Sequence, residues 1–124
     1  MTLLLIFVAG GLGSVFRYVL GGFVQTKAHA GFPVGTLVVN VLGCIAIGIV
    51  AKFFLHSQTQ LLTRTTLIVG FCGGFTTFST FSYDALGLIA GGMWARATMY
   101  VGITVASCLV GTALGFALTP SLSR

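Results

Sequence analysis

Apolar residues fall in four long blocks, and this pattern constrains the fold more than any other feature of the chain. The blocks cover approximately residues 3–24, 34–55, 67–90 and 97–118. Each is close to the roughly 20 residues that a helix needs to cross the hydrocarbon of a membrane. The joins between the blocks hold polar residues and the chain breakers Pro33 and Gly91-Gly92. The sequence therefore predicts four transmembrane helices in a single domain, residues 1–124.

The scarcity of charge also indicates a membrane protein. Only 6% of the 124 residues are charged, whereas 56% are apolar. Soluble domains carry roughly 25% charged residues, and a water-soluble fold of this size could not cover its surface with so few. We interpret the first block as a retained helix, because it lacks the basic start of a signal peptide and carries Arg17. The expected fold class is an all-α, multi-pass membrane protein.

Basic residues are spread evenly over the two sides of the predicted bundle. Three fall on the side that holds both termini and three on the other: Lys52, Arg64 and Arg124 against Lys27, Arg96 and Arg17. Because the bias in lysine and arginine normally sets orientation, two oppositely inserted copies could pair as an antiparallel, dual-topology homodimer. The small size of the chain also favours pairing. Four packed helices fill their own centre with side chains, so a pathway through the protein would need a second subunit. The alternative is a weakly biased protein that inserts in one orientation.

The third block contains the most unusual stretch, "GGFTTFSTFSYD", at residues 73–84. Gly73-Gly74 followed by Thr76-Thr77 predicts that one helix ends and another begins at a cap in the middle of the membrane. Such a break frees backbone carbonyls, which is tolerated where the backbone is buried in protein or meets water or an ion. Freed carbonyls suit a hard cation such as sodium.

Aromatic rings and hydroxyls alternate after this break. Phe78 and Phe81 share a helix face, among the hydroxyls of Ser79, Thr80 and Ser82. Ring edges are electropositive, so they could attract an anion without the full positive charge that would trap it. The alternative is that both rings face lipid or pack in the core, although the density of hydroxyls favours a pathway.

Other polar residues lie at membrane depth, where each needs a partner. Asn40 offers two donors and an acceptor, and it either joins helices or meets a passing solute. Arg17 either extends to the headgroups or makes an electropositive mouth that attracts anions. The fourth block has four polar residues at i, i+4 spacing, which places them on one helix face: Tyr100, Thr104, Cys108 and Thr112. This polar track either lines a pathway or makes a polar contact with another helix.

Cysteines and histidines carry no recognisable chemistry in this sequence. Cys44, Cys72 and Cys108 all lie within apolar blocks and have no metal-type spacing, so we expect small buried hydrophobes. His29 and His56 lie in the joins, and neither has a partner acid or cysteine in the sequence.

Three motifs in order make the chain resemble the Fluc (CrcB) fluoride channels over essentially its whole length. They are "GGLGSVFRY" at residues 10–18, "GTLVVNVLGC" at 35–44 and "GGFTTFSTFSYD" at 73–84. The resemblance implies a dual-topology homodimer with two fluoride pores. It also implies a structural sodium ion at the dimer centre, held by the backbone carbonyls of Gly73 and Thr76.

The resemblance also assigns roles along the pathway. Asn40, Phe78, Phe81 and the polar track of the fourth block match pore residues, and Arg17 matches a vestibule residue. The chain departs from the family at two positions. Cys108 stands where serine is more usual, and a thiol is a poor hydrogen-bond donor. Asp84 stands where glutamate is usual, and it receives no assigned role.

The expected function is a passive, fluoride-selective channel of the bacterial inner membrane that exports fluoride from the cytoplasm. Hydroxyl and amide donors and ring edges would replace part of the water shell of the ion. No phosphate-binding loop is present, so we expect neither an enzyme nor a protein that binds nucleotides or nucleic acid. Two alternative functions remain. The first is a small proton-coupled exporter of drugs or cations, although such an exporter needs a membrane-embedded acid and the first block has none. The second is a non-transporting accessory membrane protein.

Overall fold

The computed structural model describes residues 1–28, 31–55 and 61–120, and all its regular elements are helical. In chain order they are α1 (Thr2–Ala28), α2 (Val34–Phe53), α3 (Leu61–Thr65), the π-helix η2 (Thr66–Cys72), α4 (Gly73–Phe75), α5 (Phe78–Ala90) and α6 (Trp94–Leu118). Because α3 to α5 follow one another along one span, the described residues hold four helices long and apolar enough to cross a membrane. The predicted four-span helical fold is confirmed, while His29, His56 and Arg124 lie outside the described residues.

The helices extend beyond the apolar blocks at several ends. α1 continues to Ala28, the third span begins at Leu61, and α6 begins at Trp94. The hydropathy pattern misses these turns because it stops at polar residues such as Thr63 and Arg64. Arginine is a good helix former and threonine an acceptable one, so helical structure continues where the apolar pattern has ended.

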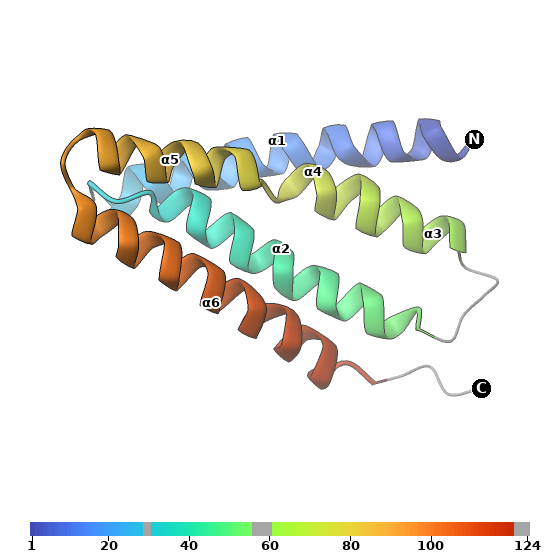
Figure 1. Cartoon of the computed structure of the whole chain (residues 1–124). Coiled ribbons are helices and arrows are strands. Elements are labelled where there is room, and N and C mark those ends of the chain that lie inside the picture. The colour runs from blue at the N-terminus through green and yellow to red at the C-terminus, as the bar shows by residue number, and fades with distance from the viewer. Residues whose placement is uncertain (29–30, 56–60, 121–124) are drawn as a thin grey trace.

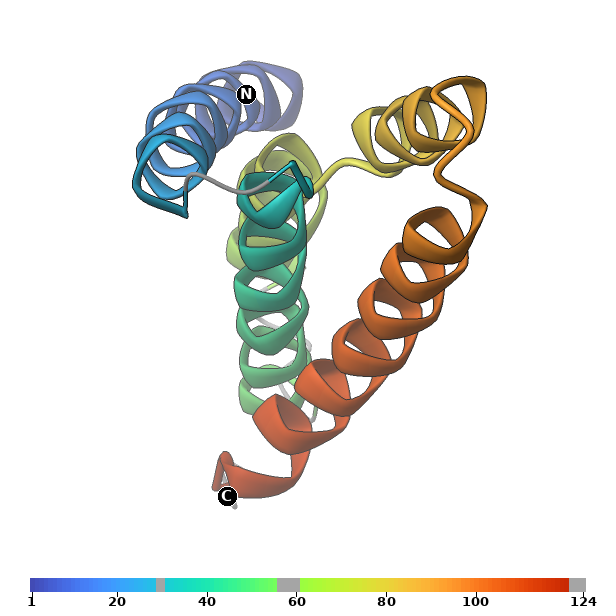
Figure 2. The same cartoon turned by 90° about the vertical axis from the view of Figure 1, so that its left-hand side faces the viewer.

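The spans lie side by side, and α1 begins at the same end of the molecule at which α6 finishes (Figure 1). An even number of spans requires this arrangement. α2 and α6 run in the same direction along much of their length (Figure 1). Seen from one end, α5 lies well away from α1 and close to the start of α6 (Figure 2). The third span therefore has two halves with different neighbours.

Glycines allow the first half of the third span to lie directly against α1. A Cβ atom added to Gly74 would collide with the carbonyl oxygen of Gly10, and one added to Gly13 would collide with that of Phe71. Gly73-Gly74 therefore do not end the helix as the sequence suggested. The helix continues through Phe75, and the break follows at Thr76 and Thr77.

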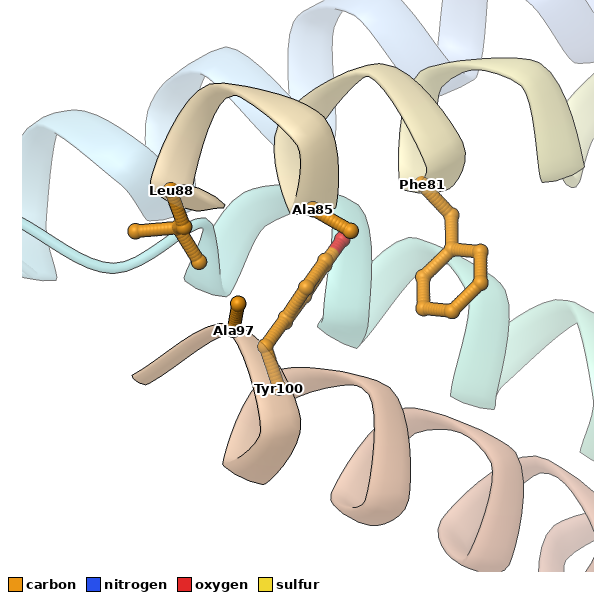
Figure 3. Packing of buried hydrophobic residues seen from close by; sticks show 5 residues of the cluster. All are labelled: Phe81, Ala85, Leu88, Ala97 and Tyr100. Atoms are coloured by element: carbon orange, nitrogen blue, oxygen red, sulfur yellow. The ribbon is translucent and has the colours of Figure 1, made fainter. Parts of the chain in front are cut away.

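A small apolar cluster joins the second half of the third span to α6. It consists of Phe81, Ala85, Leu88, Ala97 and Tyr100. Tyr100 extends from α6 toward α5 beside Ala85 (Figure 3). The turn between the two helices contains Gly92 at φ 74°, a left-handed conformation that glycine adopts without steric cost. This packing fixes where α5 lies after the break.

Candidate functional site

The break in the third span is the centre of the candidate site. Thr76 is extended, with φ −83° and ψ 157°, and Thr77 follows at φ −151° and ψ 116°. The Thr77 hydroxyl then accepts a hydrogen bond of 3.1 Å from the backbone N–H of Thr80, which caps α5. The predicted break and fresh N-cap are both present, with Thr77 as the cap.

Asn40 holds this break from α2. Its Nδ2 donates to the carbonyl oxygen of Thr77 at 3.0 Å, and its Oδ1 accepts from the backbone N–H of Thr77 at 2.8 Å. The side chain is only 7% exposed. One buried amide thus satisfies both backbone groups of a residue that has left the helical ladder. The helix-joining contact considered for Asn40 is therefore present.

The same hydrogen bonds redirect two backbone amides. In a continuous α-helix, the N–H of Thr77 would bond the carbonyl of Gly73, and that of Thr80 would bond the carbonyl of Thr76. Here the first donates to Asn40 and the second to the Thr77 hydroxyl. The Gly73 and Thr76 carbonyls therefore lose their usual helical donors. Neutral carbonyl oxygens of this kind are ligands that suit a hard cation.

A cavity of about 290 Å³ lies on one side of the break, between α2, α5 and α6. Five residues assigned to the pathway line it: Asn40, Phe78, Phe81, Thr104 and Cys108. The Thr104 hydroxyl is buried and has no hydrogen-bond partner among the residues that the structure describes. Leaving a buried hydroxyl unpaired costs about 1–3 kcal/mol, so this group favours a site where water or a solute is bound.

The two phenylalanines after the break have different surroundings. Their ring centroids are 5.4 Å apart with the planes tilted by 47°. Phe81 is 7% exposed and packs on Tyr100 at 5.3 Å, whereas Phe78 is 77% exposed. Core packing therefore accounts for the position of Phe81, while no contact within the chain buries Phe78.

A larger cavity of about 760 Å³ lies beside the break, with Thr77 in the walls of both cavities. Arg17, Thr80 and Asp84 line it. The Asp84 carboxylate accepts hydrogen bonds from the Thr36 hydroxyl at 2.7 Å and from the Tyr100 hydroxyl at 3.4 Å. The single acidic residue of the chain is thus held by α2 and α6 in the wall that Arg17 shares.

Four residues assigned to the pathway line neither cavity: Ser79, Ser82, Tyr100 and Thr112. The Ser82 hydroxyl donates to the carbonyl of Phe78 in its own helix at 3.0 Å, a common arrangement for a serine within a helix. The Ser79 hydroxyl lies 3.1 Å from that of Thr77. Thr112 lies where α2 and α6 meet, since a Cβ on Gly48 would collide with its carbonyl oxygen.

A second polar track, on α2, faces the one predicted on α6. The pairs are Thr36 with Tyr100, Asn40 with Thr104, Cys44 with Cys108 and Gly48 with Thr112. Thr36 and Tyr100 both donate a hydrogen bond to the same oxygen of Asp84. The Asn40–Thr104 and Cys44–Cys108 pairs line the smaller cavity, and Gly48 contacts the backbone of Thr112. Thr36 and Cys44 were missed from the sequence, although their i, i+4 spacing around Asn40 was a visible signal.

Comparison with known proteins agrees with this geometry. Residues 4–116 match the sequence profile of the family described as CrcB-like protein, Camphor Resistance (CrcB). A relative from Geobacter sulfurreducens is 46% identical over 92% of this chain and 93% of its own. One from Nitratidesulfovibrio vulgaris is 44% identical over 90% of this chain and 89% of its own. Both are named fluoride-specific ion channel FluC. The chain therefore belongs to the CrcB-like family.

Proposed function

We propose that this protein is a fluoride-specific ion channel and not an enzyme. The observation that carries this conclusion is the full-length similarity to relatives named fluoride-specific ion channels, at 44% and 46% identity. The geometry supports it, because five of the residues assigned to an anion pathway converge from α2, α5 and α6 on one small cavity.

Neutral donors in this cavity are suited to a small anion that must enter and leave. The Thr104 hydroxyl has no described protein partner, and one of the two Nδ2 protons of Asn40 remains after the bond to Thr77. The edge of the Phe78 ring adds a weak positive field. Conduction requires binding that is favourable but weak, and these groups replace part of the water shell of fluoride without a full positive charge.

We infer that two chains pair as an antiparallel homodimer. The exposed face of α5 supports this inference, because Phe78 is 77% exposed at the edge of a cavity that the chain leaves open on that side. The even split of basic residues supports insertion in both orientations. A second copy would bury Phe78 and supply the missing wall of each pathway.

We also infer a structural sodium ion between the two copies. The Gly73 and Thr76 carbonyls fit this role, since both are neutral oxygens whose helical donors bond elsewhere. One chain offers two such ligands, so a complete shell needs ligands from the partner as well. A bound cation would attract the carbonyl oxygens of both chains at the break and so hold the two chains together.

The direction of transport follows from the membrane potential if the protein lies in the bacterial inner membrane, as we propose. Moving one elementary charge through the potential is worth about 2.3 kcal/mol per 100 mV. A cytoplasm that is electrically negative therefore drives an anion outward through a passive pathway. The protein would lower cytoplasmic fluoride without any coupled energy source.

Fluoride efflux from liposomes containing the purified protein tests this function. A channel is electrogenic, so fluoride can leave the liposomes only while another ion balances its charge. We therefore expect efflux to depend on a potassium ionophore, which lets potassium leave with the fluoride. Protein-free liposomes are the control. Efflux that instead required a proton gradient, or none above the control, would contradict the channel and favour a proton-coupled exporter or an accessory protein, respectively.

A further inference from the structure

Two cysteines from different helices meet at the edge of the smaller cavity. Cys44 of α2 and Cys108 of α6 both line it, and both are half-buried free thiols. Both therefore border the same space from neighbouring helices. From the sequence we expected small buried hydrophobes at both positions and placed Cys108 in the polar track, but no spacing indicated that the two cysteines line one cavity.

The packing of α2 on α6 keeps these thiols opposite each other. The two helices run in parallel (Figure 1), and four residues beyond each cysteine, Gly48 lies against the carbonyl of Thr112. A side chain at Gly48 has no space there, so the helix backbones approach closely. One helical turn before this contact, Cys44 and Cys108 line the same cavity, and rotation of the two side chains can adjust the distance between their sulfurs.

We propose that Cys44 and Cys108 form a dithiolate site for a soft, two-coordinate divalent cation, of which Hg²⁺ is the probe. Thiolate sulfur prefers soft metal ions. No group of three His, Cys, Asp or Glu side chains that could hold a metal occurs among the described residues. Two sulfur ligands suit a cation that accepts linear coordination, whereas a structural zinc site takes four ligands.

The reaction can be balanced without a redox step. Mercuric chloride reaches the thiols as a neutral molecule. Two S–H bonds and two Hg–Cl bonds break, two S–Hg bonds form, and two protons and two chloride ions are released. The product is a neutral bis-thiolate, which avoids the large cost of leaving an uncompensated charge in a low-dielectric interior. A monovalent soft cation would leave the same site with a net negative charge.

Binding at this site closes the fluoride pathway, a consequence that rests on the proposed function. The bound cation would bridge two walls of the cavity that Asn40, Phe78 and Thr104 also line. A bridge there both occupies space and prevents α2 and α6 from separating. Fluoride passage is therefore blocked until a competing dithiol removes the cation.

A mass measurement on the purified full-length protein tests the site directly. After treatment with mercuric chloride and a wash with excess monothiol, we expect one mercury per chain in the wild type. Cys44→Ala and Cys108→Ala should retain none, since a single thiolate loses mercury to the competing monothiol. Cys72→Ala is the matched control, because Cys72 is 2% exposed and does not line the cavity.

Other results of the mass measurement would overturn the site. Equal retention in Cys44→Ala and the wild type, two mercury atoms per chain, or none in the wild type would each do so. Cys44→Ser and Cys108→Ser give a second pair of variants should either alanine variant fail to fold, as judged by helical circular dichroism.

Fluoride efflux then tests closure, with each variant compared with its own untreated rate. Mercuric chloride should abolish efflux in the wild type and Cys72→Ala and leave most of it in the Cys44 and Cys108 variants. Dithiothreitol should restore the wild-type rate. Retained mercury with undiminished efflux would overturn closure alone. A protein that carries no fluoride before treatment contradicts the proposed function, while the mass measurement still decides the metal site.

Discussion

Asn40 makes the helix-joining contact that the sequence suggested, and it also lines the proposed pathway. Its amide holds the backbone of Thr77 with two hydrogen bonds, and the same side chain lines the smaller cavity. The remaining Nδ2 proton is the part of the group available to a solute. The structural contact therefore orients the amide, and an oriented donor binds an anion without first losing rotational freedom.

Replacing Asn40 should therefore damage stability and transport together. In Asn40→Ala, the N–H and C=O of Thr77 lose their partners, and each unpaired buried group costs about 1–3 kcal/mol. We expect a lower melting temperature in detergent and a loss of most fluoride efflux. Thr26→Ala is the control, since the exposed Thr26 hydroxyl donates to the Gly22 carbonyl of its own helix. An Asn40→Ala protein with wild-type stability would show that the break does not depend on this amide.

Because Phe78 is exposed and Phe81 is buried, substitutions at the two positions should distinguish an effect on fluoride transport from an effect on core packing. Phe78→Ile removes an exposed ring, so the folding of a single chain should barely change, while fluoride efflux falls about threefold to tenfold. This range corresponds to about 0.5–1.5 kcal/mol for a lost aromatic interaction. The same change at Phe81 should also lower stability, by about 1–3 kcal/mol, because that ring is in the core.

Phe7→Ile provides the matched control for Phe78, because Phe7 is 78% exposed on α1 and lines neither cavity. Efflux and melting temperature are measured on the same preparations. If Phe78→Ile and Phe7→Ile carried fluoride at equal rates, the exposed ring would have no role in the pathway.

At the scale of the helices, close contacts decide the geometry of the site. Gly48 allows the carbonyl of Thr112 to approach α2, and Gly115 allows that of Ile45 to approach α6. These contacts set the register in which the polar tracks of α2 and α6 face each other. The cavity between the two helices therefore depends on residues that do not line it.

Adding one methyl group at this contact should separate the two helices. Gly48→Ala places a Cβ against the Thr112 carbonyl, and overpacking of this kind costs about 1–3 kcal/mol. Gly11→Ala is the control, since nothing lies within 4 Å of a Cβ added there, and alanine favours a helix by about 0.5–1 kcal/mol. Thermal unfolding in detergent should show a lower midpoint for Gly48→Ala only. An unchanged midpoint would mean that the helix contact is not tight.

The sequence predicts the elements of this fold better than their contacts. Four apolar blocks suffice for the four spans, and Thr77 is recognisable as a cap because its hydroxyl precedes a new helix. Gly73-Gly74 looked like the break because glycine often ends a helix, but it also allows two helices to pack closely. Only the approach of α1 shows that Gly74 serves packing. The track on α2 was overlooked for a related reason, since Thr36 and Cys44 gain meaning only opposite α6.

At the scale of the whole molecule, the proposed pathway needs a second chain to be complete. Large apolar side chains are exposed on all four spans, as expected for surfaces that face lipid or another copy. Three of them, Phe78, Val105 and Leu109, also line the smaller cavity, and Phe78 is the most exposed of the three. The dimer proposed above would complete this wall, and it requires chains in opposite orientations.

Biasing the orientation should therefore separate the two chains of the dimer. Two lysines added to the join between α5 and α6 should favour one orientation, because positive charge is retained in the cytoplasm. We expect this variant to lose fluoride transport when expressed alone and to regain it when co-expressed with a variant biased the other way. Reporter fusions on each terminus measure the orientation. A wild-type chain found in one orientation only would contradict dual topology.

The reversal potential of the purified protein in a planar bilayer tests the fluoride pathway most directly. With fluoride and chloride gradients set in opposite directions, current through weak neutral donors in a narrow cavity should reverse at the fluoride equilibrium potential. A pH gradient should leave this value unchanged, because a channel does not couple fluoride to protons. A reversal at the chloride potential, or one that moves with the pH gradient, would contradict a fluoride-selective channel.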